Sequence, residues 1–132
     1  MNDNRSSIVR RSTNIYTSYF ANWHNFPEGS IIVSITRFAP KGWNGLELRS
    51  CAPSEGLLRD YKNGNIDEYI FEQRYLMQLN KDSNLRERVK AVLNELVKKN
   101  NVILCCYEKK GDFCHRNILS KWLSPDIEIN EL

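Results

Sequence analysis

One continuous stretch, residues 102–123, constrains the fold more than any other part of the chain. Its first part, 102–108, is a short apolar run with β-branched residues, which predicts a buried strand. A charged loop containing Gly111 follows, and 115–123 then carries apolar side chains at helical spacing, which predicts an amphipathic helix. Open α/β sheets bind ligands at the carboxyl ends of their strands, where helix N-termini also offer free N–H groups to anions. We therefore expect the functional site at this strand–helix junction.

The remaining chain supplies the other elements of an α/β domain. Residue preferences and apolar spacing predict strands at 15–20, 31–36 and 46–51, and helices at 53–61, 67–79 and 82–97. The last of these helices leads directly into the 102–108 strand, as at the end of a β–α–β crossover. The sequence thus predicts one compact α/β domain over residues 14–123, Rossmann-like and three-layered, with a small, mainly parallel sheet flanked by helices.

The two ends of the chain differ in charge, and both are expected to lie outside this domain. Residues 1–13 form a basic tail with Arg5, Arg10 and Arg11, which we expect to be flexible. The alternative is that these arginines help to bind a polyanion. Residues 124–132 are acidic and are expected to be a loosely held tail.

Composition limits the class of protein and its surroundings. With 132 residues, 41% hydrophobic and 27% charged, the chain has the composition of an ordinary globular domain. No apolar stretch approaches the roughly 18 residues of a membrane span, and no apolar run follows the N-terminal arginines as a secretory signal requires. We therefore expect no membrane partner and a cytoplasmic location, where the four cysteines stay reduced. The net charge of +3 is compatible with a phosphate-bearing partner but does not require one.

Arg116, in the first turn of the last expected helix, is the strongest local sign of a bound anion. A cation is disfavoured at a helix N-terminus unless an anion offsets the helix dipole. The guanidinium group could therefore fork onto a phosphate or a carboxylate. It could equally pair with a nearby acid such as Glu108 and fix the loop in place.

Three neighbours of Arg116 are candidate catalytic residues. Glu108 could act as a general base, bind a ribose hydroxyl or attack an anomeric carbon, and the alternative is an ion pair with a cation. His115 could serve as a general acid or base, or it could donate a hydrogen bond to a strand-end carbonyl. Cys114 lies where a helix N-terminus lowers a thiol pKa, so nucleophilic attack competes with simple packing as its role.

The other cysteines carry weaker signals. Cys105 and Cys106 are adjacent in a strand and should point to opposite faces, so one of them is expected to be a small buried hydrophobe. A zinc site from Cys106, Cys114 and His115 has the right residue types, but the chain has no C-x-x-C pair and no evident fourth ligand. We therefore predict no metal and no cofactor.

A second cluster follows the 31–36 strand. Arg37, Lys41 and Trp43 lie in a segment with two glycines and a proline, which is typical of a functional loop. If this strand and the 102–108 strand are parallel neighbours, we expect Arg37 and Arg116 to face one pocket. An aromatic side chain beside cations suits a base or ribose held near a phosphate, although Trp43 could also fold onto the core.

These residues resemble those of a known family. Cys106-Tyr107-Glu108, a short charged loop and Cys114-His115-Arg116 resemble the C-terminal signature of the domain of unknown function 488 (DUF488) family. Arg37 and Pro40 resemble its acid-x-Arg-x-x-Pro pattern, with Ile35 standing at the acidic position. The resemblance implies a compact Rossmann-like domain, found in bacteria and their phages, with the named arginines, Glu108, Cys114 and His115 clustered at one end of the sheet. It implies no specific reaction.

The leading hypothesis is a phosphate pocket that acts on a nucleotide, a nucleoside or a nucleic-acid end. Arg116 would hold the phosphate with help from Arg37, and Glu108 would face the sugar, with cleavage of an N-glycosidic bond as the specific reaction considered. The alternative is a non-catalytic nucleotide or nucleic-acid binding module, such as a phage protein that sequesters a ligand. A third possibility is a protein-interaction domain with a vestigial pocket. The sequence does not decide whether a reaction is catalysed, nor the oligomeric state.

Overall fold

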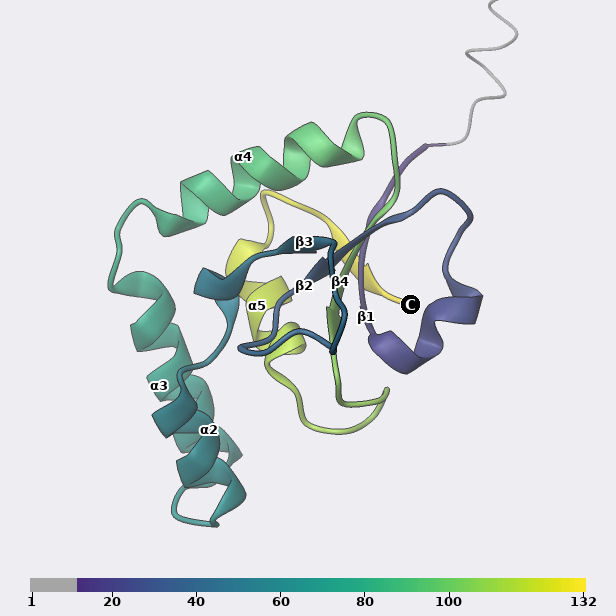
Figure 1. Cartoon of the computed structure of the whole chain (residues 1–132). Helices are drawn as coiled ribbons and strands as arrows, with labels where there is room; N and C mark the ends of the chain where they lie inside the picture. The colour runs from purple at the N-terminus through teal and green to yellow at the C-terminus, as the bar shows by residue number, and fades with distance from the viewer. Residues whose placement is uncertain (1–11) are drawn as a thin grey trace, which may run out of the picture.

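The computed structural model describes residues 12–132 and contains a five-stranded, all-parallel sheet in the order β3-β2-β4-β1-β5 (Figure 1). The strands are β1 (Ile15–Tyr19), β2 (Ile31–Ser34), β3 (Leu46–Glu47), β4 (Val102–Cys106) and β5 (Ile129–Glu131). The α-helices are α2 (Glu55–Lys62), α3 (Glu68–Asn80), α4 (Leu85–Val97) and α5 (His115–Leu123), and the 3-10 helices are η1 (Phe20–Asn25) and η2 (Arg49–Cys51). The predicted α/β class is confirmed. Arg5, Arg10 and Arg11 of the expected basic tail lie outside the described residues.

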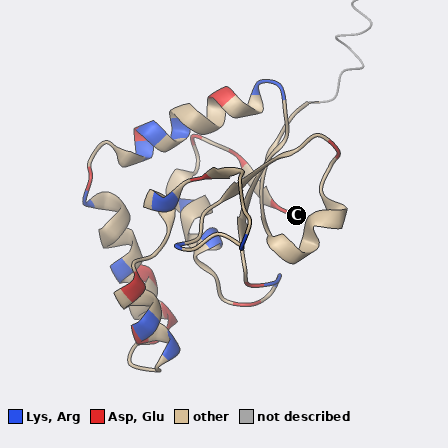
Figure 2. Ribbon diagram, in the orientation of Figure 1, with Lys and Arg blue, Asp and Glu red and all other residues tan. Residues whose placement is uncertain are grey.

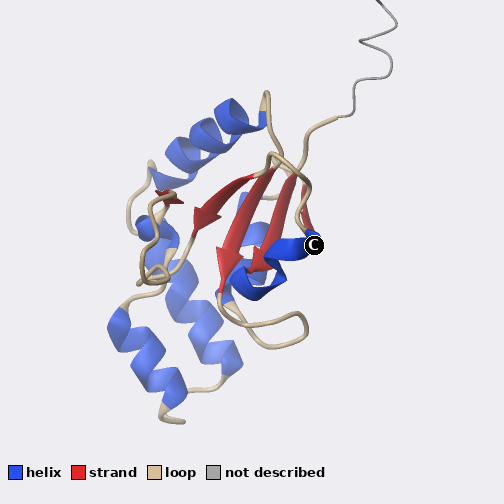
Figure 3. Ribbon diagram, turned by 45° about the vertical axis from the view of Figure 1, so that its right-hand side comes forward, coloured by secondary structure: helices blue, strands red, loops and turns tan. Residues whose placement is uncertain are grey.

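The direction of each crossover decides which face of the sheet a helix covers. The connections from β3 to β4 and from β4 to β5 run the same way across the sheet, so right-handed crossovers place α2 to α5 on one face. The connection from β1 to β2 runs the opposite way and places η1 on the other face (Figure 3). One face therefore carries the helices and the main core, and the other is covered by a single short 3-10 helix and loops.

Strand β4 is the centre of the fold, because it pairs with both β1 and β2 and all five of its residues are buried. Val102, Leu104 and Cys106 belong to the core shared with the helices, whereas Ile103 and Cys105 point to the opposite face. Because of this alternation, Cys106 rather than Cys105 faces α5.

The helix starts follow their capping residues. Ser54 Oγ accepts a hydrogen bond from Leu57 N–H, and Asp67 Oδ1 accepts one from Ile70 N–H, so these side chains cap α2 and α3 close to the predicted starts at 53 and 67. Helix α4 begins at Leu85, later than the predicted start at 82, and its N-cap Asn84 makes no side-chain capping hydrogen bond. The expected edge strand at 46–51 is shorter than predicted, since only Leu46–Glu47 pairs with β2. Among the described residues, no helix is both long and apolar enough to cross a membrane.

The C-terminal segment corrects one expectation. Instead of a loose tail, residues 124–132 bring the chain back to the sheet as β5, which pairs in parallel with the open edge of β1. Ile127 is buried in the core and the N–H of Leu132 donates to the carbonyl of Thr17. The edge of β1 that does not face β4 has free backbone N–H and C=O groups, and the segment forms hydrogen bonds with them even though it is acidic.

Candidate functional site

A cavity of about 160 Å³ opens at the carboxyl edge of the sheet, between the loop after β2, helix α2 and the start of α5. Its lining residues are Thr36, Arg37, Phe38, Pro53, Leu58, Lys62, Tyr107, Glu108 and His115. The parallel strands all point to this edge (Figure 3), so the segments that follow β2 and β4 meet there. Small-molecule pockets usually enclose at least about 300 Å³, so this cavity holds only part of a larger ligand.

Arg37 is partly buried in the wall of this cavity. Its Nε donates to the carbonyl of Pro53 at 3.3 Å and its Nη2 donates to the carbonyl of Ala52 at 3.4 Å. These neutral carbonyls orient the guanidinium group but leave its charge without a carboxylate partner among residues 12–132. Lys62 of α2, an exposed residue, lines the same cavity and adds a second positive charge.

His115 is buried at the start of α5 and lines the cavity. Its Nε2 lies 2.7 Å from the carbonyl oxygen of Ile35, which can only accept, so Nε2 carries the proton. Burial lowers the pKa of His115, which keeps the ring neutral at pH 7 and leaves Nδ1 unprotonated. His115 thus makes the hydrogen bond to a strand-end carbonyl that was one of its two expected roles.

Glu108 is exposed two residues beyond β4, and its side chain lines the cavity. Its backbone carbonyl accepts a hydrogen bond from Arg116 Nη1, which fixes the course of the loop. The carboxylate itself forms no ion pair with a described residue. Glu108, His115 and Arg37 are therefore brought together at one cavity, as the sequence suggested.

Arg116 has the second of its two expected roles, since it pairs with an acid and holds the loop, but the acid is Glu131 rather than Glu108. The residue is fully buried, and its guanidinium contacts Cys106 Sγ at 2.8 Å and Glu131 Oε2 at 3.0 Å. Its Cζ lies 6.0 Å from the centre of the Tyr19 ring, and its Nε has no hydrogen-bond partner among the described residues. It does not line the cavity, so the expectation that Arg37 and Arg116 share one pocket is not met. The physical reason is that β5 supplies a carboxylate, Glu131, to the buried cation.

Cys106 and Cys114 lie side by side beneath the cavity, with their sulfur atoms 2.7 Å apart. The hydrogen bond from Cys114 and the adjacent Arg116 guanidinium lower the pKa of Cys106 despite its burial. Donation of the same proton to Cys106, together with burial, raises the pKa of Cys114. The thiolate is therefore favoured on Cys106, whereas the sequence drew attention to Cys114 because of its place at the helix start.

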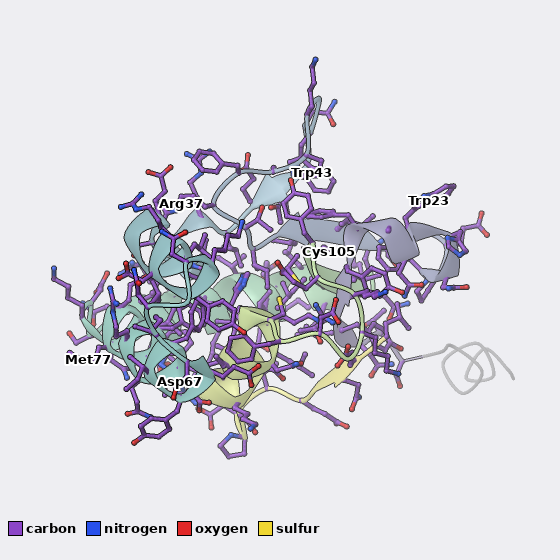
Figure 4. All side chains as sticks on the ribbon, turned by 90° about the horizontal axis from the view of Figure 1, so that it is seen from below. Trp23, Arg37, Trp43, Asp67, Met77 and Cys105 are labelled. Carbon is purple, nitrogen blue, oxygen red and sulfur yellow. The ribbon has the colours of Figure 1, made fainter. Side chains whose placement is uncertain are left out.

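The second expected cluster is divided. Lys41 is exposed and Trp43 packs against Phe20, with ring centres 5.4 Å apart, while Trp43 Nε1 donates to the carbonyl of Leu46. Neither Lys41 nor Trp43 lines the cavity, and Figure 4 shows Arg37 and Trp43 at separate places on this side of the molecule. The aromatic residues at the cavity are instead Phe38 and Tyr107, whose hydroxyl donates to the carbonyl of Phe38.

Sequence reasoning missed two contributors to this region, Lys62 and Glu131, and considered Cys106 only as a zinc ligand and as part of the family signature. The side chains of β4 alternate between the two faces of the sheet, so one cysteine of the adjacent pair had to face the last helix. This alternation was the sequence signal that could have identified Cys106. Lys62 and Glu131 had no local signal, since each arrives from an element distant in the sequence. A larger and more open groove of about 740 Å³ runs along α3, but none of the predicted site residues lines it.

One set of potential metal ligands lies in this region. The ligand atoms of Cys106, Glu108 and Cys114 are within 4.8 Å of one another. Two thiolates on one tetrahedral zinc ion are about 3.8 Å apart, from Zn–S bonds of about 2.3 Å, whereas these sulfur atoms are 2.7 Å apart. Arg116 also donates to the sulfur that a metal would need. The arrangement does not fit a zinc centre.

Comparison with known proteins gives one family. The family profile DUF488-N3a, described as "Active DUF488-N3 subclade", matches residues 18–126. No curated protein and no solved structure is significantly similar to the chain. The match contains the whole cavity and the Cys-His-Arg triplet but ends before β5, which carries Glu131. Because the match spans most of the chain, this protein belongs to the DUF488 family, a family of unknown function, in its DUF488-N3a subclade.

Proposed function

We propose that the protein binds a phosphate-bearing ligand of the nucleotide class in the cavity between β2, α2 and α5. The observation that carries this proposal is the pair of cations, Arg37 and Lys62, which line the cavity without a carboxylate partner among the described residues. A guanidinium held by backbone carbonyls is pre-oriented, and a phosphate would supply the missing negative charge. Charges of both signs are mixed along α2 and α3 (Figure 2), so the proposal rests on the cavity rather than on a broad basic surface.

The aromatic walls support a nucleotide over a simple anion. Phe38 is 61% exposed and Tyr107 is 51% exposed, and both line the cavity beside the cations. Exposed aromatic rings beside a phosphate site provide surfaces on which a base can stack. Because the cavity is small, a phosphate and sugar fit inside while the base lies against the outer rings. A nucleic-acid end would present the same groups.

Glu108 is the residue that we assign to chemistry on the ligand. Glu108 lines the cavity together with the neutral His115, and among the residues lining the cavity it is the one acid. A carboxylate beside a held sugar could activate water or attack the anomeric carbon, and cleavage of an N-glycosidic bond is the reaction proposed. His115 acts here as a positioning residue, because its Nε2–H is committed to Ile35.

A non-catalytic binding module is the second candidate, and one observation favours it. The Nε2–H of His115 and the thiol of Cys114 are engaged in contacts within the protein, which leaves Glu108 without a second proton-transfer group free to act on a ligand. In that case the ligand leaves the site unchanged.

The binding test is calorimetric titration of the full chain with inorganic phosphate, ribose 5-phosphate and adenosine 5′-monophosphate. We expect affinity to rise along this series and to fall about 10- to 100-fold in Arg37→Ala, as for a lost charge-assisted hydrogen bond. Lys41→Ala is the matched control, since Lys41 is an exposed cation that does not line the cavity. Failure of all three probes to bind, or equal losses in both variants, would overturn the proposal.

The reaction test is chromatography of the ligand after incubation with nucleoside monophosphates and a single-stranded oligonucleotide. Release of free base by the wild type, lost in Glu108→Gln with phosphate affinity retained, supports N-glycosidic cleavage. Recovery of intact ligand from a protein that binds it supports the binding module. Release of base by Glu108→Gln at the wild-type rate would overturn the role of Glu108.

A further inference from the structure

We propose that Cys106 and Cys114 form a peroxide-reactive dithiol that closes to a reversible disulfide beneath the cavity. The two sulfur atoms are 2.7 Å apart, so an approach of about 0.7 Å brings them to bonding distance. They are eight positions apart in sequence and meet because the loop after β4 turns back, helped by a left-handed residue, Gly111, with φ of 94°. This proposal does not depend on what the cavity binds.

Cys106 is the sulfur that attacks. Arg116 Nη1 lies 2.8 Å from its Sγ, and Arg116 is fully buried, so its positive charge acts on the sulfur with little screening by water. The Sγ of Cys114 lies 2.7 Å from the same sulfur, and with Cys106 as the thiolate the remaining proton of the pair belongs to Cys114. The lowered pKa of Cys106 agrees with this geometry, whereas burial raises the pKa of both Cys51 and Cys105 to about 12. Among the four cysteines, Cys106 therefore has the environment of a reactive thiolate.

The oxidation proceeds in two balanced steps. The Cys106 thiolate attacks hydrogen peroxide, its S–O bond forms as the O–O bond breaks, and hydroxide leaves, which gives a sulfenic acid. The Cys114 sulfur then attacks the sulfenic sulfur, the S–S bond forms, and the hydroxyl group leaves as water with the thiol proton of Cys114. The two sulfurs lose two electrons in total, and the peroxide gains them.

Burial determines the class of oxidant. Cys106 has no exposed surface and Cys114 is 3% exposed, so a bulky disulfide such as oxidised glutathione does not reach them in the folded protein. Even a water molecule does not reach Cys106 in the closed structure, so oxidation requires a local opening. Hydrogen peroxide needs a much smaller opening than glutathione and is the oxidant that we commit to. Closure would join the end of β4 to the start of α5 and fix the loop that carries Glu108.

The test treats the full chain with hydrogen peroxide, blocks the remaining thiols under denaturing conditions and maps the peptides by mass spectrometry. We expect the intact protein to lose the mass of two hydrogen atoms, with one crosslink between Cys106 and Cys114 that dithiothreitol reverses. Oxidised glutathione at equal concentration should react at least tenfold more slowly. No crosslink, a crosslink between another pair, or equal rates with both oxidants would overturn the proposal.

Two variants separate the roles of the sulfurs. Cys114→Ser should stop at the first step, so that Cys106 gains the mass of one oxygen atom and no crosslink forms. Cys106→Ser should leave Cys114 unoxidised over the same time, and Cys105→Ser, the matched control, should crosslink as the wild type does. Oxidation of Cys114 in the absence of Cys106 would overturn the assignment. The wild-type peptide map tests the crosslink itself even where a variant fails to fold.

Discussion

Two arginines at the same edge of the sheet have opposite environments. Arg37 is partly exposed, contacts two backbone carbonyls and lines a cavity. Arg116 is fully buried and contacts a thiol, a backbone carbonyl and the carboxylate of Glu131. A guanidinium whose charge is already compensated inside the protein has nothing to gain from an external anion. A half-buried guanidinium whose partners are neutral carbonyls can gain from binding one.

The comparison explains how one short motif serves two purposes. In the Cys114-His115-Arg116 triplet, His115 faces the cavity, whereas Cys114 and Arg116 contact Cys106 below it. The start of α5 thus lies between the cavity, which is open to a ligand, and the buried group formed by Arg116, Glu131 and Cys106. The predictions that follow test this division, beginning with the largest effect.

Arg116→Ala should destabilise the protein by about 3–5 kcal/mol, because it leaves a carboxylate and a favoured thiolate without their buried cation. Arg88→Ala is the control, since Arg88 and Asp82 form an exposed pair worth at most about 1 kcal/mol. Urea unfolding of both variants measures the difference. Equal destabilisation would show that Arg116 is not held as the structure places it.

Glu131→Gln should cost about 1.5–3 kcal/mol, since a hydrogen bond to a charged group is weakened while the side-chain shape is kept. It should also lower the pKa of Cys106 further, because Arg116 then has one negative partner fewer. Urea unfolding gives the first quantity and the pH dependence of thiolate absorbance gives the second. Glu128→Gln, also near β5 and exposed, should change neither. An unchanged Cys106 pKa in Glu131→Gln would contradict the coupling.

Stability should fall as the pH is lowered below about 6.5, by up to about 1.4 kcal/mol per pH unit from His115 alone. Burial lowers the pKa of His115 in the folded protein below its ordinary value of about 6.5. At a pH between these two pKa values, His115 is protonated in the unfolded chain but neutral in the folded protein. The contribution is therefore present above pH 6.5 and is lost on acidification. His115→Gln should remove this slope below pH 6.5, and His24→Gln, an exposed control, should not. A slope that survives in His115→Gln would argue against a buried neutral ring.

Arg37→Ala should change the free energy of unfolding by less than about 1 kcal/mol, because its hydrogen bonds to the two backbone carbonyls are long, at 3.3 and 3.4 Å, and the side chain is only partly buried. The same variant is expected to lose phosphate affinity, so stability and binding separate at Arg37. A loss of stability as large as that in Arg116→Ala would remove the distinction between the two arginines.

Much of the fold could be predicted from the sequence because its signals are local. An apolar run predicted β4, and the predicted helix starts at 53 and 67 lie beside Ser54 and Asp67, whose side chains cap α2 and α3. In parallel sheets, ligand sites lie at the carboxyl ends of the strands. This rule predicted the edge of the sheet at which Arg37, Glu108 and His115 lie. The failure was at β5, where an acidic composition suggested a loose tail and the open edge of β1 decided otherwise.

The sequence by itself determined the α/β class, the strand–loop–helix core and the group of residues at its junction. Only the tertiary structure decided that Arg116 is compensated by Glu131, that Lys62 joins Arg37 at the cavity, and that the thiolate is favoured on Cys106 rather than Cys114. The reason is physical: local patterns report backbone preferences and burial, whereas the charge state of a buried group depends on partners from distant segments. The chemistry of this site depends on such partners.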